Sequence, residues 1–441
     1  MRKPNIAIIG GGCAGLSAAV ALVDKGYDVT VFEASPHLGG RARTVLVEHN
    51  SLMNLLDNGQ HILLGAYRET LALLRTVGIA ENEAFLRLPL HIRMRSSADK
   101  PEFLLKSEHL LPAPFNLLFG LFGCEGLTLT ERASAIKFMA QLKLAGYQVA
   151  EDGFLGAYLT DKKQSRKLIE LLWEPLCLAA LNTPIAVAST RIFLNVLRDT
   201  FTGSKKNSDF LLPKADLSKF LANPLAQHIQ AKGGTVLLNQ QVRKIAANHS
   251  EFIVSTKENN TQFSHVIVAT SPSNIAKLLS NFNQLNHVLS QTEAFGYQPI
   301  YTIYIQYPAD IELPNIMTGF TNKLSQWAFD RGQLCGQKGL VAVVLSGTGA
   351  HQQLSHDELA LKVANELHQT FHHLPKPLWH KVIAEKRATF SCVPNLARPT
   401  HKTNHPNLFL AGDYTYAPYP STIEGAVRSG NACAKLVEKS N

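Results

Sequence analysis

The sequence is short of paired cysteines. Its six cysteines stand singly among 441 residues, with no Cys-x-x-Cys spacing, at Cys13, Cys124, Cys177, Cys335, Cys392 and Cys433. Neither a disulfide framework nor a zinc knuckle is indicated, and we expect no metal site. Single thiols of this kind fit a reducing cytoplasm.

Long apolar runs are missing too. Even the apolar stretch from Leu110 to Gly123 is interrupted by Pro112, Pro114 and Asn116. It therefore falls short of the ~18–20 residues of a membrane span. We expect a cytoplasmic protein, either soluble or peripheral to the inner membrane.

The start of the chain offers one alternative. Basic residues followed by apolar ones up to Val23 have the order of a secretory signal. Five glycines would weaken a signal helix, however, and they fit a nucleotide-binding turn better. They are Gly10, Gly11, Gly12, Gly15 and Gly26.

Charged residues make up only 17% of the chain and hydrophobic ones 45%, an ordinary globular profile. This excludes collagen-like, coiled-coil and disordered chains, and at ~100–200 residues per domain the length predicts more than one domain. The net charge of +9 favours anionic partners such as phosphates or lipid headgroups, without choosing between them. We expect no nucleic-acid partner.

A nucleotide-binding motif opens the chain. An apolar strand over 5–9 leads into a G-x-G-x-x-G turn over 10–15, a helix, and a second strand over 28–32. Gly10 permits the tight turn, Gly12 lets the backbone approach a pyrophosphate beside Ala14, and Gly15 allows close contact between helix and strand. The order of elements predicts a complete βαβ unit.

Glu33 ends the second strand, 18 residues after Gly15. A carboxylate at this place accepts hydrogen bonds from ribose hydroxyls and opposes a 2′-phosphate. NADP is therefore disfavoured, and either NAD or FAD remains.

A second glycine turn follows, with Gly39 and Gly40 before Arg41 and Arg43. The planar guanidinium of an arginine suits a pyrophosphate, although a solvated basic loop is the alternative. With this segment the chain resembles the superfamily of flavin-containing amine oxidases and carotenoid desaturases, which implies FAD as the cofactor.

The C-terminal part carries the same resemblance. A strand over 407–411 leads into Gly412 and Asp413, and Ser421-x-x-Glu424 predicts a capping box on the last helix. The resemblance implies that Asp413 meets ribityl or phosphate oxygens. It also implies that the helix start, with Thr422 and Ile423, faces the flavin. A turn residue at a strand end is the alternative for Asp413.

Two middle segments, 233–242 and 263–272, are expected to be strands of the same sheet, with a strand over 251–255 between them. The resemblance places Val242 against the adenine and Thr270 beside the cofactor. No second G-x-G-x-x-G occurs downstream. We therefore expect no NAD(P)H domain and an external electron donor of unknown identity.

Longer strings indicate a narrower family. Segments 56–68 and 173–184, with shorter matches over 193–199, 212–217, 386–390 and 414–422, resemble the hydroxysqualene dehydroxylases, squalene-associated flavoenzymes of bacterial hopanoid biosynthesis. The resemblance implies an apolar C30 isoprenoid substrate, with reduced FAD replacing the hydroxyl of hydroxysqualene to give squalene. A carotenoid-type desaturase, an amine oxidase and a non-catalytic carrier are the alternatives.

The remaining candidates lie in the substrate part. Asp57 and His61 are polar residues in an apolar context, so they are candidates for a proton-donating pair or for a structural hydrogen bond. The helical pattern over 127–144 has Arg132, Lys137 and Lys143 on its polar side. Such a helix lies either on a membrane or in solvent. An upstream synthase is the other expected partner.

The predicted fold class is α/β. A Rossmann-like FAD-binding domain of amine oxidase and desaturase type carries an inserted α+β substrate domain. We expect residues 1–85, 208–285 and 385–441 in the FAD-binding domain, and residues 86–207 and 286–384 in the substrate-binding domain.

Overall fold

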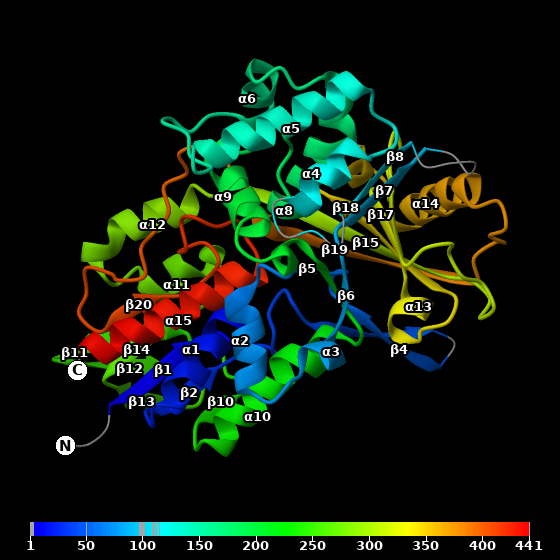
Figure 1. The fold of residues 1–441 in the computed structure, drawn as a ribbon. Coiled ribbons are helices and arrows are strands. Elements are labelled where there is room, and N and C mark those ends of the chain that lie inside the picture. Colours follow the sequence, from blue (N-terminus) through cyan, green and yellow to red (C-terminus); the bar gives the residue numbers. More distant parts are fainter. Residues whose placement is uncertain are drawn as a thin grey trace.

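A five-stranded parallel sheet organises the N- and C-terminal parts of the chain (Figure 1). The computed structural model describes residues 4–49, 51–96, 102–107, 111, 113 and 115–440. The sheet has the order β10 (Thr235–Leu237), β2 (Asp28–Phe32), β1 (Asn5–Ile9), β14 (His265–Val268) and β20 (Leu408–Leu410). The strand order reverses between β1 and β14, and ligands of such sheets bind at this point, beyond the carboxyl ends of the strands.

The predicted strands over 5–9 and 28–32 are confirmed. The strand expected over 233–242 is shorter, because Asn239 adopts a φ of 57° and turns the chain out of the sheet. Val242 therefore lies beyond β10, where it is buried. The strand over 251–255, β12 (Glu251–Ser255), belongs to a separate sheet with β11 (Lys244–Asn248) and β13 (Asn260–Phe263).

Helix α1 (Cys13–Val23) packs against the C-terminal helix α15 (Ile423–Ser440) (Figure 1). Gly430 makes the approach close, because a Cβ at this position would overlap Ser17 Oγ and the backbone oxygen of Ala14. The first turn of α1, which follows the glycine-rich loop, is thereby held against a helix more than 400 residues away in sequence.

The capping box predicted at Ser421 and Glu424 is wrong. Thr422 caps α15, its Oγ1 accepting from the N–H of Gly425 at 3.0 Å. The fully buried Glu424 carboxylate instead accepts from the N–H and hydroxyl of Thr70, at the start of α2 (Arg68–Thr76). The Ser421 hydroxyl donates to Asp413, so neither side chain of the predicted box caps the helix.

A second, seven-stranded sheet carries the middle of the chain. Its order is β19 (Trp379–Phe390), β15 (Tyr297–Gln306), β18 (Leu340–Ser346), β17 (Trp327–Asp330), β16 (Met317–Phe320), β7 (His91–Arg95) and β8 (Phe103–Lys106). The pairing of β16 with β7 joins two stretches of chain that are more than 200 residues apart. Helix α14 (His356–Thr370) packs against β15 and β19.

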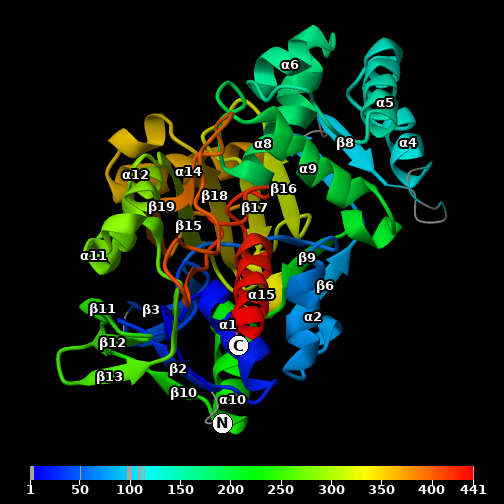
Figure 2. The ribbon, with the colours of Figure 1, turned by 90° about the vertical axis from the view of Figure 1, so that its left-hand side faces the viewer.

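Helices cover the far end of this sheet (Figure 2). They are α4 (Phe115–Phe122), α5 (Leu129–Leu144), α6 (Leu155–Asp161), α7 (Arg166–Leu168), the π-helix η1 (Ile169–Trp173), α8 (Glu174–Leu181) and α9 (Thr190–Phe201). The helix expected over 127–144 is thus confirmed as α5, which Thr128 and Glu131 cap reciprocally. No helix in the described ranges is long and apolar enough to cross the bilayer.

Smaller elements connect these parts. A hairpin of β3 (Thr44–His49) and β4 (Leu52–Asp57) and a sheet of β5 (Leu63–Leu64), β9 (Phe210–Pro213) and β6 (Phe85–Leu88) lie between the two larger sheets in sequence. The remaining α-helices are α3 (Glu81–Ala84), α10 (Asn223–Ala231), α11 (Ile275–Leu279), α12 (Asn286–Glu293) and α13 (Arg331–Cys335). The division into an FAD-binding and a substrate-binding domain stays a proposal, and β19 runs across its boundary at residue 385.

The close approach of α1 and α15 can be tested at Gly430. We expect Gly430→Ala to lower the free energy of unfolding by about 1–3 kcal/mol, because the added methyl group has no space. Gly153→Ala is the control, since a Cβ there would meet nothing within 4 Å. Urea unfolding of both variants measures the difference, and equal stabilities would contradict the packing described.

Candidate active site

The two glycine turns of the sequence lie side by side at the carboxyl end of β1. Gly12 and Gly39 form a parallel bridge, and a Cβ on Gly40 would lie 3.5 Å from the Cα of Gly12. A Cβ on Gly12 itself would meet nothing within 4 Å, so open space faces this backbone. The structure thus brings the two predicted phosphate-binding turns together around a space that a side chain would fill.

Gly10 and Gly15 allow close packing of the backbone, whereas Gly12 faces open space. Gly10 has a φ of 118°, and a Cβ there would lie 2.6 Å from the backbone oxygen of Ala269, at the end of β14. A Cβ on Gly15 would overlap the backbone oxygen of Gly10. Ala14, which precedes Gly15 in the chain, is buried. Both glycines keep the turn tight against β14.

Glu33 lies at the carboxyl end of β2, next to the first glycine turn. Its two carboxylate oxygens accept from the N–H groups of Gly11 at 2.7 Å and Ser35 at 2.8 Å. Each oxygen retains a lone pair. The carboxylate is thus oriented beside the turn, as a ribose-binding residue requires.

Arg41 connects the N-terminal turn to the C-terminal segment. Its Nη2 donates to both carboxylate oxygens of Asp413 at 2.8 Å, and its Nη1 donates to the Ala388 oxygen at 2.7 Å. Ser421 also donates to Asp413. Arg43 instead turns back to the Gly40 oxygen, at 2.5 Å.

Three buried hydroxyl oxygens near these residues have no hydrogen-bond partner in the described part of the chain: those of Thr270, Tyr297 and Tyr414. The charges of Arg41 and Asp413 act on both tyrosines, whose pKa values burial raises. Buried polar groups normally find partners. FAD carries phosphate, hydroxyl and carbonyl groups, so the residues present fit it.

The start of α15 completes this region. Asp413 and Ile423 are buried, and Gly412 donates its N–H to Ser429 Oγ at 2.8 Å. With Thr422 capping the helix, the positive end of the α15 dipole lies beside the Arg41–Asp413 pair. This end can stabilise negative charge on a bound group.

Arg398 is a residue that the sequence did not reveal. It donates to four backbone oxygens of the segment that follows β20, those of Asp413, Tyr414, Ala417 and Tyr419, at 2.5–3.0 Å. Its guanidinium also stacks on a phenyl ring, that of Phe390, at 4.5 Å. Desolvation lowers the pKa of Arg398 to about 10, so it is charged at neutral pH. No sequence motif predicts these contacts, because the acceptors are backbone atoms.

Asp57 occupies a buried network. Its carboxylate accepts from the N–H of Leu217 at 2.8 Å and lies 3.5 Å from Arg331 Nη1. Burial raises the pKa of Asp57 to about 6, although Arg331 opposes the shift. Tyr304 donates to its backbone oxygen at 2.8 Å.

His61, four residues on, is half-buried. Its Nδ1 lies 2.6 Å from the backbone oxygen of Gly59, to which it donates, and burial lowers its pKa, as does the charge of Arg41. The neutral imidazole therefore presents Nε2 as an acceptor. The side chains of Asp57 and His61 thus make separate contacts.

The six thiols are unsuited to covalent chemistry. Burial raises the pKa of every one of them, that of Cys13 beside the glycine turn to about 12. A thiol attacks only as its thiolate. Burial therefore disfavours the thiolate that a cysteine bond to a cofactor would need. Among the described residues, no three His, Cys, Asp or Glu side chains gather where they could hold a metal ion.

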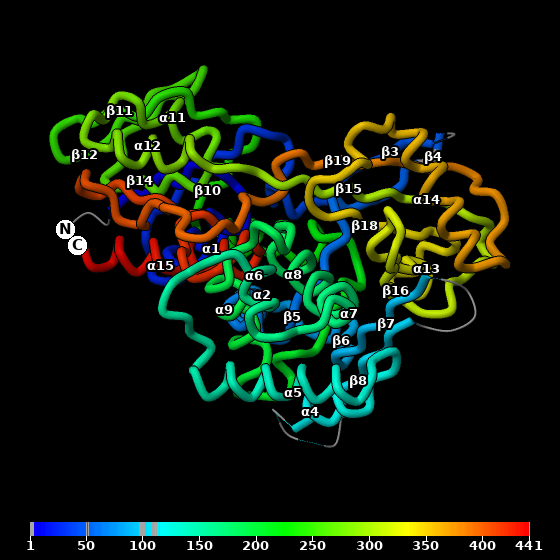
Figure 3. Tube along the Cα trace, turned by 90° about the horizontal axis from the view of Figure 1, so that it is seen from above, coloured from blue at the N-terminus to red at the C-terminus, as the bar shows by residue number. Residues whose placement is uncertain are grey.

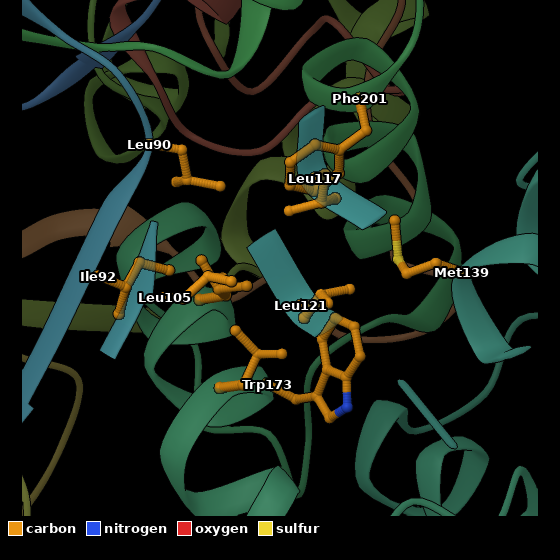
Figure 4. A pocket seen from close by; sticks show the side chains of 10 residues that line it. Leu90, Ile92, Leu105, Leu117, Leu121, Met139, Trp173 and Phe201 are labelled. Carbon is orange, nitrogen blue, oxygen red and sulfur yellow. The ribbon is translucent and has the colours of Figure 1, made fainter. Parts of the chain in front are cut away.

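An apolar cavity lies under α4, in the helical layer (Figure 4). Its space is only about 10 Å³, close to what one water molecule needs. Every side chain that lines it is apolar: Leu90, Ile92, Leu105, Leu117, Leu121, Met139, Leu172, Trp173, Leu176 and Phe201. The cavity suits hydrocarbon and offers no charged partner.

The family follows from a direct comparison. The model of the flavin-containing amine oxidoreductases matches residues 13–437, which include the second glycine turn and the Arg41–Asp413 pair. The chain belongs to this family. It is an FAD-dependent oxidoreductase of α/β fold.

Individual relatives are more distant. Hydroxysqualene dehydroxylase of Zymomonas mobilis is 26% identical over 435 residues, covering 97% of this chain and 98% of the relative. The 15-cis-phytoene desaturase of Glycine max is 26% identical over 467 residues, covering 99% and 80%. The structure of cyclohexylamine oxidase from Brevibacterium oxydans superposes with a TM-score of 0.73 at 15% identity, covering 99% of each chain.

We expect Arg398→Lys to weaken FAD binding about tenfold, because one ammonium cannot replace a planar guanidinium across four carbonyls. Arg398→Ala should lose more of the affinity for FAD than Arg398→Lys. Free guanidinium added to Arg398→Ala should restore part of the lost affinity. Arg166→Lys is the control, since Arg166 is exposed and pairs only with Glu170 among the described contacts. Titration of the apoprotein with FAD measures the effect. Unchanged affinity of Arg398→Lys would remove Arg398 from the site.

Proposed function

We propose that this protein catalyses the reductive dehydroxylation of hydroxysqualene to squalene, in bacterial squalene and hopanoid biosynthesis. The observation that carries the proposal is the alignment with a dehydroxylase over nearly the full length of both chains, and the apolar lining of the cavity under α4 supports it. A C30 isoprenoid is hydrocarbon along almost its entire length, and apolar lining is what recognises it.

The reaction replaces an allylic C–O bond by a C–H bond. It consumes two electrons and two protons and releases water. When bound in its reduced form, FAD supplies the electrons. An external donor, still to be identified, must supply electrons to each new cycle, since the sequence has no second dinucleotide motif.

The residues of the chain have defined tasks in this proposal. Glu33 holds the ribose hydroxyls, and Gly12, Gly40 and Arg43 surround the pyrophosphate. Val242 contacts the adenine. The Arg41–Asp413 pair and the start of α15, with Thr422 and Ile423, hold the flavin end, and Thr270 borders it. The bridge between Gly12 and Gly39 and the Arg41–Asp413 ion pair support the assignments at the two turns, whereas those of Val242 and Thr270 rest on the resemblance.

The cavity must widen to accept the substrate. A space of about 10 Å³ holds no isoprenoid, so side chains on α4 or α9 have to move. Leu117 and Leu121 on α4 and Phe201 on α9 are the lining residues that these two helices contribute. Movement confined to side chains would open the cavity without unfolding the layer.

A desaturase of carotenoid type is the second candidate. It removes hydride from an isoprenoid and needs an acceptor for a proton rather than a donor. The neutral His61, with Nε2 free of a proton, is the observation that favours it. An amine oxidase is less well supported, because the cavity lining offers an ammonium no carboxylate or other polar side chain.

The location we propose is the cytoplasm, at the periphery of the inner membrane. A C30 isoprenoid partitions into lipid, so an enzyme without a spanning helix in its described part must collect it from the membrane surface or from an upstream synthase.

Anaerobic stopped-flow spectroscopy tests the proposal. We expect hydroxysqualene to reoxidise the dithionite-reduced holoenzyme, with squalene identified by mass spectrometry. Phytoene should leave the oxidised enzyme unchanged. Reduction of oxidised enzyme by phytoene, with no reaction of hydroxysqualene, would establish the desaturase. If the enzyme reacted with neither compound, a non-catalytic carrier would be the remaining candidate.

Single substitutions separate the roles of Asp57 and His61. We expect Asp57→Asn to lower the thermal midpoint and FAD content, because an amide cannot neutralise the buried Arg331. His61→Phe should keep its FAD and lose turnover about tenfold or more, since an Nε2 that accepts from the substrate hydroxyl would orient the C–O bond. Full turnover of His61→Phe would exclude that contact.

The pH dependence of turnover tests Asp57 as a proton donor. With a pKa of about 6, Asp57 is protonated below and ionised above this pH. If Asp57 donated the proton, turnover would fall about tenfold per pH unit above 6. We expect no such fall between pH 6 and 8, because the contacts of Asp57 with Leu217 and Arg331 occupy the carboxylate.

A further inference from the structure

Helix α4 has two apolar faces. Leu117 and Leu121 point inward and line the cavity. Phe115, Phe119 and Phe122 lie on the outer face and are 53%, 58% and 63% exposed. Single exposed apolar residues are ordinary, but three phenylalanines at spacings of four and three residues form one continuous patch.

Helix α5 extends this patch. Leu129 and Leu144, at its two ends, are 70% and 89% exposed. Ala133 and Ala140 lie between them at helical spacing and are also exposed. The helices pack on each other at one outer edge of the molecule (Figures 2 and 3). We call Phe115, Phe119, Phe122, Leu129 and Leu144 the α4–α5 surface.

Exposed basic residues outnumber exposed acidic ones on the elements around this surface. The backbone of Lys106 lies against Gly120 of α4, and Arg132 Nη1 donates to the Phe122 oxygen at 2.9 Å. The basic segment after α6 is tied to α5 where Ser134 Oγ donates to the Lys163 oxygen at 3.3 Å. The exposed lysines of these elements include Lys106, Lys137, Lys143, Lys163 and Lys167; the exposed carboxylates include Glu125 and Asp161, while Glu170 is paired with Arg166.

An apolar patch within a basic rim matches one kind of partner, a bilayer with anionic headgroups. Phenylalanines insert at the boundary of headgroups and acyl chains, and lysines bind the phosphates. A protein partner of neutral surface would leave the lysines without counter-charges. The net charge of +9 acts in the same direction.

We propose that the α4–α5 surface docks on an anionic lipid bilayer, with Phe115, Phe119 and Phe122 inserted. Since Leu117 and Leu121 of the same helix line the cavity, docking places the cavity one helix away from the lipid. An isoprenoid then passes between membrane and cavity beside α4 without crossing water. The docking itself is independent of the proposed reaction, whereas the identity of the isoprenoid rests on the proposed function.

Vesicle binding of the full-length holoenzyme tests the proposal. We compare sedimentation with phosphatidylcholine vesicles with and without phosphatidylglycerol. The test variant carries Phe115→Ser, Phe119→Ser and Phe122→Ser. The control carries Leu361→Ser and Leu378→Ser, which change exposed apolar residues elsewhere. Retained flavin absorbance shows that each variant is folded.

We expect the wild type and the control to bind anionic vesicles and the phenylalanine variant to bind about tenfold or more weakly. Binding should weaken without phosphatidylglycerol or at high salt. Equal binding of wild type and phenylalanine variant would overturn the proposal, as would a wild type that binds neither vesicle. A dimer that the phenylalanine substitutions abolish, without vesicle binding, would assign the surface to self-association instead.

Turnover separates this proposal from the proposed function. With hydroxysqualene in detergent micelles, we expect the phenylalanine variant to match the wild type. With hydroxysqualene in anionic vesicles it should be about tenfold slower or more. No turnover by any variant in detergent would refute the reaction and leave the vesicle-binding result to decide the docking. Equal rates from vesicles would contradict delivery beside α4.

Discussion

The ion pair between Arg41 and Asp413 is the contact on which the arrangement of the site depends. It joins the turn after β2 to the segment after β20, 372 residues apart, at the carboxyl edge of one parallel sheet. Asp413 is almost fully buried, so its charge needs a partner. With the pair in place, the second glycine turn, Ser421 and the start of α15 converge on one point.

Helix α9 contacts both the cavity and the C-terminal segment that follows Asp413. Phe201 at the end of α9 lines the cavity, whereas Asn195 on the same helix donates to the Pro418 oxygen at 3.0 Å, and Asp199 lies 3.4 Å from Arg428 of α15. Arg398 holds the 413–419 segment from the other side. A single helix therefore connects the apolar cavity with the 413–419 segment.

Local motifs could be predicted from the sequence because their constraints are local. The first βαβ unit, Glu33 and the strand before Asp413 follow from glycine spacing and apolar runs. The role of Arg398 could not be predicted, because its partners are backbone carbonyl groups. Every residue type has such a group, so the sequence does not mark the partners. The capping box at Ser421 failed for a related reason, because Glu424 finds better donors on α2. The predicted strand over 233–242 was too long, because the chain turns at Asn239. A pattern of apolar residues does not reveal the positive φ of this residue.

The central claim is that Arg41 and Asp413 act as one unit in holding FAD. A double-mutant cycle on the FAD dissociation constant, with Arg41→Met, Asp413→Asn and the double variant, tests it most directly. The account predicts that the double variant binds no more weakly than the weaker single variant, with a coupling of about 1–3 kcal/mol. Losses that add to within about 0.5 kcal/mol would show that the two residues act independently and would contradict the account.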